Sequence, residues 1–249
     1  MLPSMKRSLL LILILVVSTA GIFWMTSVKT TTIYPDKDSY SWQSVPRANN
    51  GHSDNFEITS YNKPPYNMRG WIEFNVSSIP SQAWVISAEF RLRLWSKGDP
   101  ALGTGDSTGR IYGVYRLKQP WNETGVNWVN QPNFTEDHHA IAAVPPGQGG
   151  WYGPLLWMSW DVTDIERDWQ SGVSNYGLVV KDTQEYATRL YTTQFFTHDQ
   201  VPSQNYYPRL VVTYVLPLDL AIFGGALIAE GLLFAVITRM RISKSESSK

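Results

Sequence analysis

The chain has no cysteine among its 249 residues, and only 17% of its residues are charged. Because cysteine is missing, disulfide bonds are excluded and packing must hold the fold together. Lysine plus arginine number 21, as do aspartate plus glutamate, so the formal net charge is zero. Nucleic-acid binding requires a clustered basic surface, and we therefore expect no nucleic-acid partner.

Sequence signatures of metal-dependent and phosphate-transfer enzymes are also missing. The sequence contains no His-Glu-x-x-His motif and no phosphate-binding loop. Only four histidines are present, and on a strand the neighbours His138 and His139 would point to opposite faces instead of sharing a metal. We predict no catalytic residues, and hence a protein that is not an enzyme.

The N-terminus has the pattern of an export signal. Two basic residues precede the apolar run from Leu9 to Val17, and small residues follow as far as Ala20. This pattern favours cleavage after Ala20, although an uncut segment over residues 8–25 is long enough to stay in the bilayer. We predict a signal peptide or signal anchor over residues 1–27.

A second apolar run extends from Leu220 to Ile237 and is interrupted only by Glu230, with basic residues after it. It predicts a transmembrane helix over residues 217–238 and a basic cytoplasmic tail over residues 239–249. Residues 28–216 would then form an extracellular domain of a cell-membrane protein. The protein would have one span, or two if the N-terminal segment is not cut.

Glu230 lies near the middle of the predicted transmembrane helix, where an ionised carboxylate is costly and needs a partner. Ala221, Gly225 and Ala229 follow a spacing of small residues that lets two helices approach closely. Glu230 and Gly225 therefore predict a helix–helix partner in the membrane.

Aromatic residues are plentiful, at 13% of the chain, and they favour a β-rich fold. Between the two apolar ends the pattern is short strand, turn, short strand, which is typical of an all-β antiparallel sandwich. One short helix is predicted over residues 161–169, capped by Asp161 or Thr163. Strands are predicted near residues 31–34, 55–59, 70–75, 83–95, 109–117, 126–129, 155–161, 177–180, 190–193 and 209–214.

The stretch from Trp121 to Pro132 contains two tryptophans and three asparagines. We expect a polar turn over residues 122–125, then a short strand, with Trp121 and Trp128 closing over the turn. The amides suit irregular backbone, so a structural corner is favoured over the alternative of a ligand site.

Strand alternation predicts which side chains face outward. In the run from Ala88 to Trp95, the apolar residues alternate with Glu89, Arg91, Arg93 and Trp95, so this second set faces outward. In the run from Gly70 to Phe74, the same rule places Trp71 outward and Ile72 inward.

Several runs in this order resemble the DNRLRE domain, which is also met as disaggregatase-related repeats and is similar to an alginate-binding family of carbohydrate-binding modules. The resemblance implies a jelly-roll β-sandwich on a microbial cell surface. It also implies a binding or architectural module that does not catalyse a reaction. The runs that carry it are residues 70–80, 85–94, 114–117, 121–132, 160–163, 175–181 and 208–214.

The outward aromatic and basic residues predict where a polysaccharide or envelope glycan would bind. A tryptophan face packs on the apolar side of a sugar ring, and arginine forms paired hydrogen bonds with uronate carboxylates. The alternative is that long loops cover these tryptophans. A second candidate rim contains Trp151, Tyr152 and Trp157. The predicted carbohydrate-binding residues are Trp71, Trp84, Trp95, Arg91 and Arg93.

Asp36 and Asp38 follow the first predicted strand in what reads as an oxygen-rich turn. Such turns can bind a structural calcium ion, although plain Asx turns have the same composition. Asn75, Asn122 and Asn133 each begin a glycosylation sequon.

We therefore predict a membrane-anchored, extracellular, non-catalytic module that binds polysaccharide at the cell surface. The alternative is a structural or adhesive envelope protein that contacts other proteins through a free sheet edge or an exposed apolar patch.

Overall fold

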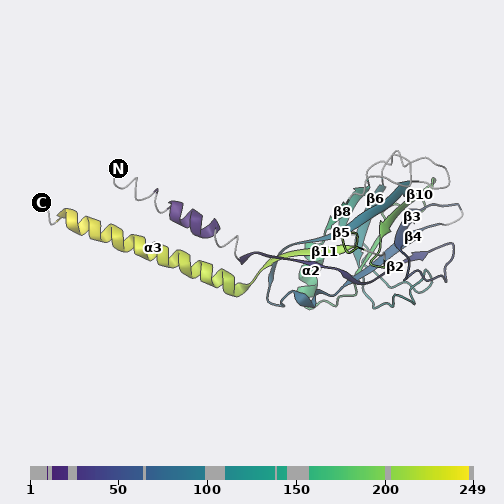
Figure 1. Cartoon of the computed structure of the whole chain (residues 1–249), viewed down its shortest axis with the longest axis horizontal. Coiled ribbons are helices and arrows are strands. Elements are labelled where there is room, and N and C mark those ends of the chain that lie inside the picture. Colours follow the sequence, from purple (N-terminus) through teal and green to yellow (C-terminus); the bar gives the residue numbers. More distant parts are fainter. Residues whose placement is uncertain are drawn as a thin grey trace. The chain divides into compact units, whose positions relative to one another are not determined.

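A computed structural model of the chain describes residues 10, 13–21, 27–63, 66–98, 110–137, 139–144, 157–199 and 203–246 (Figure 1). The chain divides into two compact units. One contains Met1–Thr30, Gln82–Trp84 and Thr213–Lys249, and the other contains Thr31–Ser81 and Val85–Val212. The predicted candidate site residues, except Trp84, fall in the second unit.

The second unit is built almost entirely of strands. The strands are β1 (Lys29–Ile33), β2 (Pro35–Trp42), β3 (Asn55–Ser60), β4 (Met68–Phe74), β5 (Trp84–Gly98), β6 (Arg110–Arg116), β7 (Ala140–Val144), β8 (Trp157–Asp161), β9 (Leu178–Asp182), β10 (Tyr191–Phe196) and β11 (Arg209–Val215). Two helical elements of this unit are η1 (Val76–Ser78) and α2 (Thr163–Gln170), and α3 (Pro217–Glu246) belongs to the first unit.

The strands pair in the order β1-β11-β5-β10-β3-β4-β9-β6-β7, with β2 also paired to β4 and β8 also paired to β5. Neighbours in the sheet are mostly distant in sequence, as in a sandwich whose connections cross between layers. The predicted all-β antiparallel sandwich is confirmed.

Aromatic packing forms the core between the layers. The Phe90 ring stacks on Trp160 with centroids 5.4 Å apart and meets Phe74 edge-on at 5.8 Å. The Trp160 indole N–H donates to the Tyr112 carbonyl at 2.9 Å, so the one polar atom of this side chain is satisfied. As strand alternation predicted for β5, Phe90, Leu92 and Leu94 are at most 1% exposed.

The prediction that Trp71 faces outward on a free surface is wrong, because its side chain is 0% exposed. A second apolar cluster covers this side of β4 and contains Trp71, Tyr115, Leu117, Val126 and Val179, with Trp121, Phe134 and Tyr176 packed against it. Both faces of β4 are therefore covered. For Trp71, the alternative that a loop covers the side chain is the correct one.

The covering segment is the tryptophan-rich stretch over residues 121–134. It is irregular, so the strand predicted over residues 126–129 is wrong. Asn49 Nδ2 donates to the carbonyl of Glu123 at 2.6 Å and to that of Val126 at 2.8 Å, and the Trp121 indole donates to the Tyr176 carbonyl at 3.0 Å. These bonds replace a strand ladder, as expected of a structural corner.

Arg69 of β4 ties this segment to the sheet. Its guanidinium lies 4.6 Å from the centre of the Trp128 ring and forms two 2.7 Å bonds to the Glu185 carboxylate. It also donates to Gln131 Oε1 at 2.9 Å. One side chain thus combines an ion pair with cation–π packing on the segment.

The predicted helix is confirmed as α2, although it begins at Thr163 and its N-cap residue is Val162, so the predicted cap by Asp161 or Thr163 is wrong. The Asp161 carboxylate accepts a bond from the Thr163 backbone N–H at 3.0 Å, while Ile165 and Trp169 are buried. Glu166 is also buried on this helix and is 0% exposed.

In the first unit, α3 contains one stretch with the length and composition of a membrane span. It runs over Asp219–Arg239 with a mean hydropathy of 2.3, in agreement with the position predicted from the sequence.

The burial of Glu166 makes the stability of the fold depend on pH. Burial raises the pKa of Glu166 from 4.5 to about 7, and a bond from Gln170 at 3.1 Å offsets this only in part. Since the folded pKa is above the unfolded value, folding is favoured with Glu166 protonated. Stability should therefore fall by roughly 3 kcal/mol as pH rises from 4.5 through 7.

The measurement is the free energy of urea unfolding of the full chain in detergent at pH 5 and pH 8. Glu166→Gln keeps the size and the hydrogen bond but cannot ionise, so its loss of stability between these pH values should be smaller by that amount. Glu136→Gln, at an exposed position, is the control. Parallel pH profiles for wild type and Glu166→Gln would refute the assignment.

Candidate functional site

The outward side of β5 carries the predicted basic and aromatic residues. The antiparallel pairing of β5 and β8 places Trp157 opposite Arg93 and Ser159 opposite Arg91. Met158 and Trp160 of β8 are buried, so Trp157 and Ser159 point to the same outward side. We call the group the arginine face and define it as Glu89, Arg91, Arg93, Trp95, Trp157, Ser159, Tyr206 and Arg209.

Two arginines of this face stack on aromatic rings. The Arg93 guanidinium lies 4.4 Å from the centre of the Tyr206 ring and 5.7 Å from that of Trp157. Arg209 lies over the Trp157 ring at 4.1 Å. Trp157 therefore has both guanidinium groups close to its ring while it keeps 36% of its surface exposed. Such stacking fixes the orientation of the arginines before any ligand arrives.

The charges on this face are not balanced. Arg91 pairs with Glu89, which also accepts a bond from Ser159 Oγ at 3.1 Å. Among the residues that the structure describes, no carboxylate pairs with Arg93 or Arg209, and the Nε atoms of both are buried without a hydrogen-bond acceptor. Burial lowers the pKa of Arg209, and the positive charges of Arg91 and Arg93 lower it further. Arg209 Nη2 donates to the Asn205 carbonyl at 2.9 Å, so the backbone satisfies part of its donor set, and the face is cationic because no carboxylate among the described residues pairs with Arg93 or Arg209.

A row of stacked aromatic rings borders the arginines. The Trp95 ring stacks on Phe196 at 5.5 Å with an interplanar angle of 13°, and Phe196 stacks on Tyr206 at 5.0 Å and 28°. The row presents ring surface beside the guanidinium groups. This combination can stack sugar rings and bind carboxylates at the same place.

The predicted binding residues thus separate into three groups. Arg91, Arg93 and Trp95 come together on the arginine face. Trp84 is 66% exposed at the start of β5, in the first unit. Trp71 is buried and cannot contact a ligand.

Sequence reasoning assigned Trp157 to a separate rim with Trp151 and Tyr152, which lie outside the described residues. It missed Tyr206 and Arg209 altogether. The alternation of Arg209 with the buried Leu210 and Val212 was the available signal for an outward arginine on β11.

The predicted calcium residues separate as well. Asp36 and Asp38 lie in β2 and not in a turn, so that part of the prediction is wrong. The β2–β4 register shifts between Pro35 and Lys37, which makes Asp36 the extra residue of a β-bulge and leaves it exposed. Asp38 is 1% exposed and faces the interior.

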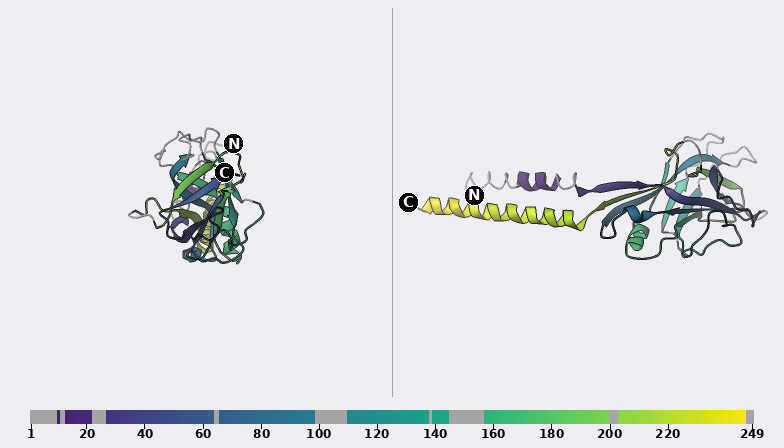
Figure 2. Two further views of the ribbon diagram at one scale, coloured as in Figure 1. Left: turned by 90° about the vertical axis from the view of Figure 1, so that its right-hand side faces the viewer. Right: turned by 60° about the horizontal axis from the view of Figure 1, so that its bottom comes forward.

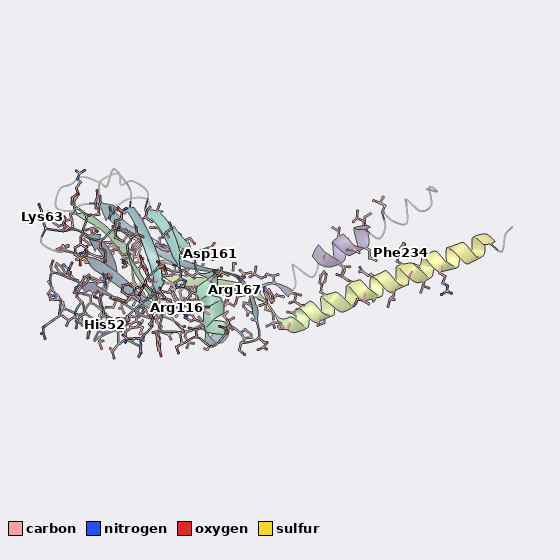
Figure 3. All side chains as sticks on the ribbon, turned by 180° about the vertical axis from the view of Figure 1, so that it is seen from behind. His52, Lys63, Arg116, Asp161, Arg167 and Phe234 are labelled. Atoms are coloured by element: carbon pink, nitrogen blue, oxygen red, sulfur yellow. The ribbon has the colours of Figure 1, made fainter. Side chains whose placement is uncertain are left out.

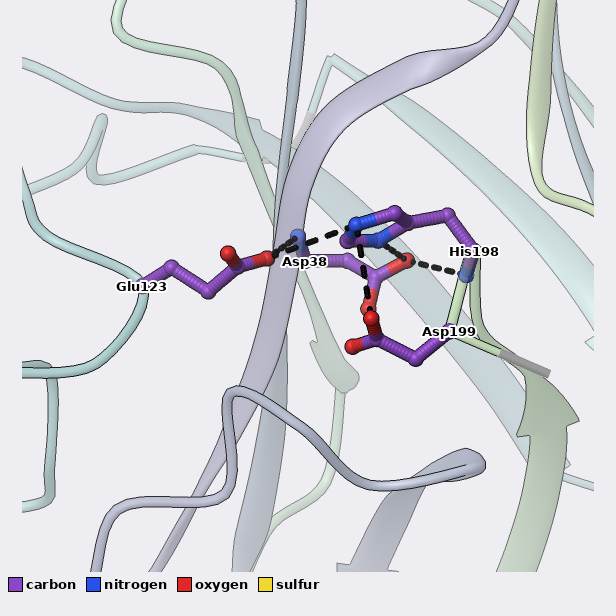
Figure 4. Close-up of side chains that lie close together, drawn as sticks. All are labelled: Asp38, Glu123, His198 and Asp199. Atoms are coloured by element: carbon purple, nitrogen blue, oxygen red, sulfur yellow. Dashed lines mark hydrogen bonds and ion pairs between the residues drawn. The ribbon is translucent and has the colours of Figure 1, made fainter.

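Asp38 belongs to a cluster with Glu123, His198 and Asp199, whose ligand atoms all lie within 4.8 Å of one another (Figure 4). The Asp38 carboxylate accepts the His198 backbone N–H at 2.8 Å and lies 3.0 Å from His198 Nδ1. The hydrogen bond to Asp38 is the main reason that the pKa of His198 rises from 6.5 to about 9. The imidazolium offsets the negative charge of the carboxylates around it.

A cleft of about 550 Å³ lies at the start of α2 and is lined by Asp161, Thr163, Asp164 and Arg167, together with His139 and residues of β5 and β7. Asp161 and Arg167 are labelled in Figure 3. Asp161 bonds to Thr163, and Arg167 donates to the Val85 carbonyl at 3.0 Å, so these groups serve the fold. None of the predicted binding residues lines this cleft.

The run from Gly105 to Gly109 fits the Gly-x-Ser-x-Gly pattern of serine hydrolases and lies outside the described residues. In those enzymes the serine sits between a strand and a helix. Here the run leads directly into strand β6 of an antiparallel sandwich. The pattern therefore carries no catalytic assignment.

The three sequon asparagines, Asn75, Asn122 and Asn133, are all exposed. Asn75 caps η1 by accepting the Ser77 N–H at 3.0 Å, and Asn122 accepts the Thr124 N–H at 2.9 Å. Glycosylation of these sites stays a prediction.

Comparison with known proteins gives one family. The family model of carbohydrate-binding module family 96 matches residues 29–214. The matched range begins with β1 and contains the whole arginine face. No curated protein matches the chain.

Proposed function

Because the chain belongs to carbohydrate-binding module family 96, we propose that its sandwich binds an acidic polysaccharide on the arginine face and catalyses no reaction. The observation that carries this proposal is the pair Arg93 and Arg209. Both guanidinium groups are stacked on aromatic rings and have no carboxylate partner among the described residues.

A polyuronate supplies carboxylates, which the guanidinium groups of Arg93 and Arg209 lack as partners. Its carboxylates would accept hydrogen bonds from Arg93, Arg209 and the exposed side of Arg91, while the apolar side of a sugar ring would pack on Trp157 or Trp95. A neutral glucan would satisfy only the stacking part. The face should therefore discriminate by charge.

The setting that we propose is the outside of a cell membrane. Residues 28–216 would lie outside, with α3 as the anchor through its span over Asp219–Arg239 and with glycans on the exposed sequons. The similarity to the DNRLRE domain, predicted from the sequence, supports a cell-surface location.

A second candidate function is an envelope contact with another protein. β7 ends the order of strands, and Ile111 and Ile141, on the paired strands β6 and β7, are 45% and 51% exposed. An edge strand with exposed apolar side chains is a surface to which another protein can add.

The arginine face predicts a charge-dependent loss of affinity. Arg93→Ala should weaken binding of alginate oligosaccharides roughly 10- to 100-fold, because a hydrogen bond between charged groups contributes about 1.5–3 kcal/mol. Isothermal titration of the full chain in detergent measures this. The wild type should bind a neutral glucan oligosaccharide far more weakly and should lose alginate affinity as salt rises.

Arg189→Ala is the matched control, since it removes the same charge from an exposed position outside the arginine face. If Arg189→Ala and Arg93→Ala weaken alginate binding equally, general charge and not this face accounts for the affinity. Unchanged affinity in Arg93→Ala would contradict the proposal directly.

We also propose that the structural ion predicted from the sequence is held by Asp38, Glu123 and Asp199 without Asp36. These three residues supply the oxygen ligands that calcium prefers. His198 would have to lose its proton or move aside for an ion to enter.

Chelation tests this ion. The melting midpoint of the purified chain should fall in EDTA and recover with added calcium, because an ion bound only by the folded state stabilises it. Asp38→Asn should abolish the effect, whereas Asp36→Asn should leave it intact. A midpoint that EDTA does not move would sink the proposal.

A further inference from the structure

Glu230 has a partner inside the first unit. The Thr19 hydroxyl of the N-terminal segment donates a hydrogen bond to Glu230 Oε1 of α3, across 211 positions of sequence. Residues 13–21 of that segment are helical, and Glu230 lies within the membrane-length stretch of α3. Figure 2 shows the N-terminal helix, in purple, running beside α3, in yellow.

The partly buried positions of both helices agree with this contact. On α3 they form one stripe at intervals of three and four residues: Asp219, Phe223, Gly224, Ala226, Leu227, Glu230 and Phe234. On the N-terminal helix they are Val16, Thr19 and Ala20. Each set lies on one helical face, and each face contains one partner of the Thr19–Glu230 bond.

The small residues predicted to mediate helix approach lie elsewhere. Gly225, together with Ala221 and Ala229, is on the exposed side of α3, and a Cβ added at Gly224 or Gly225 would meet no atom within 4 Å, whereas Ala226 and Ala20 are partly buried. An interface with a partner helix through Gly225 and Glu230 stays a prediction.

A carboxyl group in a membrane span is costly unless it is protonated or bonded. Thr19 provides a bond for one oxygen of Glu230, and the other oxygen, Oε2, is buried without a partner among the described residues. Removal of the N-terminal segment would expose both oxygens to lipid. The presence of Glu230 in α3 is therefore consistent with an N-terminal helix that stays beside α3 in the membrane.

From these observations we propose that the N-terminal segment is not removed, and that it forms a second membrane span packed antiparallel on α3. The segment leads into β1 and α3 follows β11, and these strands are neighbours in the sheet, with the Thr30 and Thr213 hydroxyls 3.1 Å apart. Basic residues flank the far end of each span, at Lys6 and Arg7 and after Ile237, as the positive-inside rule requires of a hairpin with both termini in the cytoplasm. This proposal does not depend on the arginine face.

The first test is the mass and N-terminal sequence of the wild-type chain extracted from membranes. After removal of any attached glycans, we expect the full 28.3 kDa polypeptide, with at most the initiator methionine removed. A mature chain that begins at or near Gly21 overturns the proposal, whatever the outcome of sugar-binding assays.

The second test uses the absence of cysteine from the chain. In an antiparallel pair with Thr19 opposite Glu230, Val16 lies near Phe234, so Val16→Cys with Phe234→Cys should form a disulfide on oxidation in intact membranes. Val236 is 49% exposed, and Val16→Cys with Val236→Cys is the matched control. Equal cross-linking of both pairs, or none of either, contradicts the hairpin.

The Thr19–Glu230 bond is tested in the cross-linking background. Glu230→Gln retains an acceptor for Thr19 and should keep the cross-linking yield, whereas Glu230→Leu removes the acceptor and should lower it several-fold. Equal yields in the two variants would show that the bond does not hold the spans together.

Discussion

The sandwich depends on how the outer side of β4 is covered. Trp71 is fully buried on that side, and the tryptophan-rich segment over residues 121–134 closes over it through Val126 and Phe134. Arg69 fastens the segment by pairing with Glu185 while it lies over Trp128. With no disulfide available, this apolar cluster and the cations of Arg69 and Lys37, which lie over Trp128 and Trp121, hold a long irregular segment in place.

That covering also decides which surface can bind. The outer side of β4 is closed, whereas the outer side of β5 keeps half-buried arginines and partly exposed rings. Trp157 and Tyr206 hold the guanidinium groups of Arg209 and Arg93 in fixed orientations, so little side-chain freedom is lost when a ligand binds. The same residue types therefore serve two purposes: at Arg69 and Trp128 they fasten a segment, and on the arginine face they leave donors for a ligand.

Strand alternation predicted β5 correctly because one side of that strand packs in the core and the other does not. It failed for Trp71 because nothing within β4 indicates that a distant segment covers its outer side. β2 was missed because Asp38, Ser39 and Ser41 are buried but polar, and Asp38 is satisfied by His198, 160 positions away. The same limit applies to the site: Arg91, Arg93 and Trp95 share one strand and were predicted. Trp157 and Arg209 join them only through the pairing of β8 and β11 with β5, and Tyr206 joins them from the turn before β11.

The central claim is that an acidic polysaccharide binds on the arginine face, and the indole N–H signals of the eleven tryptophans in an NMR titration with alginate oligosaccharides test it most directly. The signals of Trp157 and Trp95 should shift as ligand is added, because their rings border Arg93 and Arg209. Those of the buried Trp71 and Trp160 should stay in place. Shifts confined to Trp84, or to Trp121 and Trp128, would contradict the claim and move the binding site to another surface.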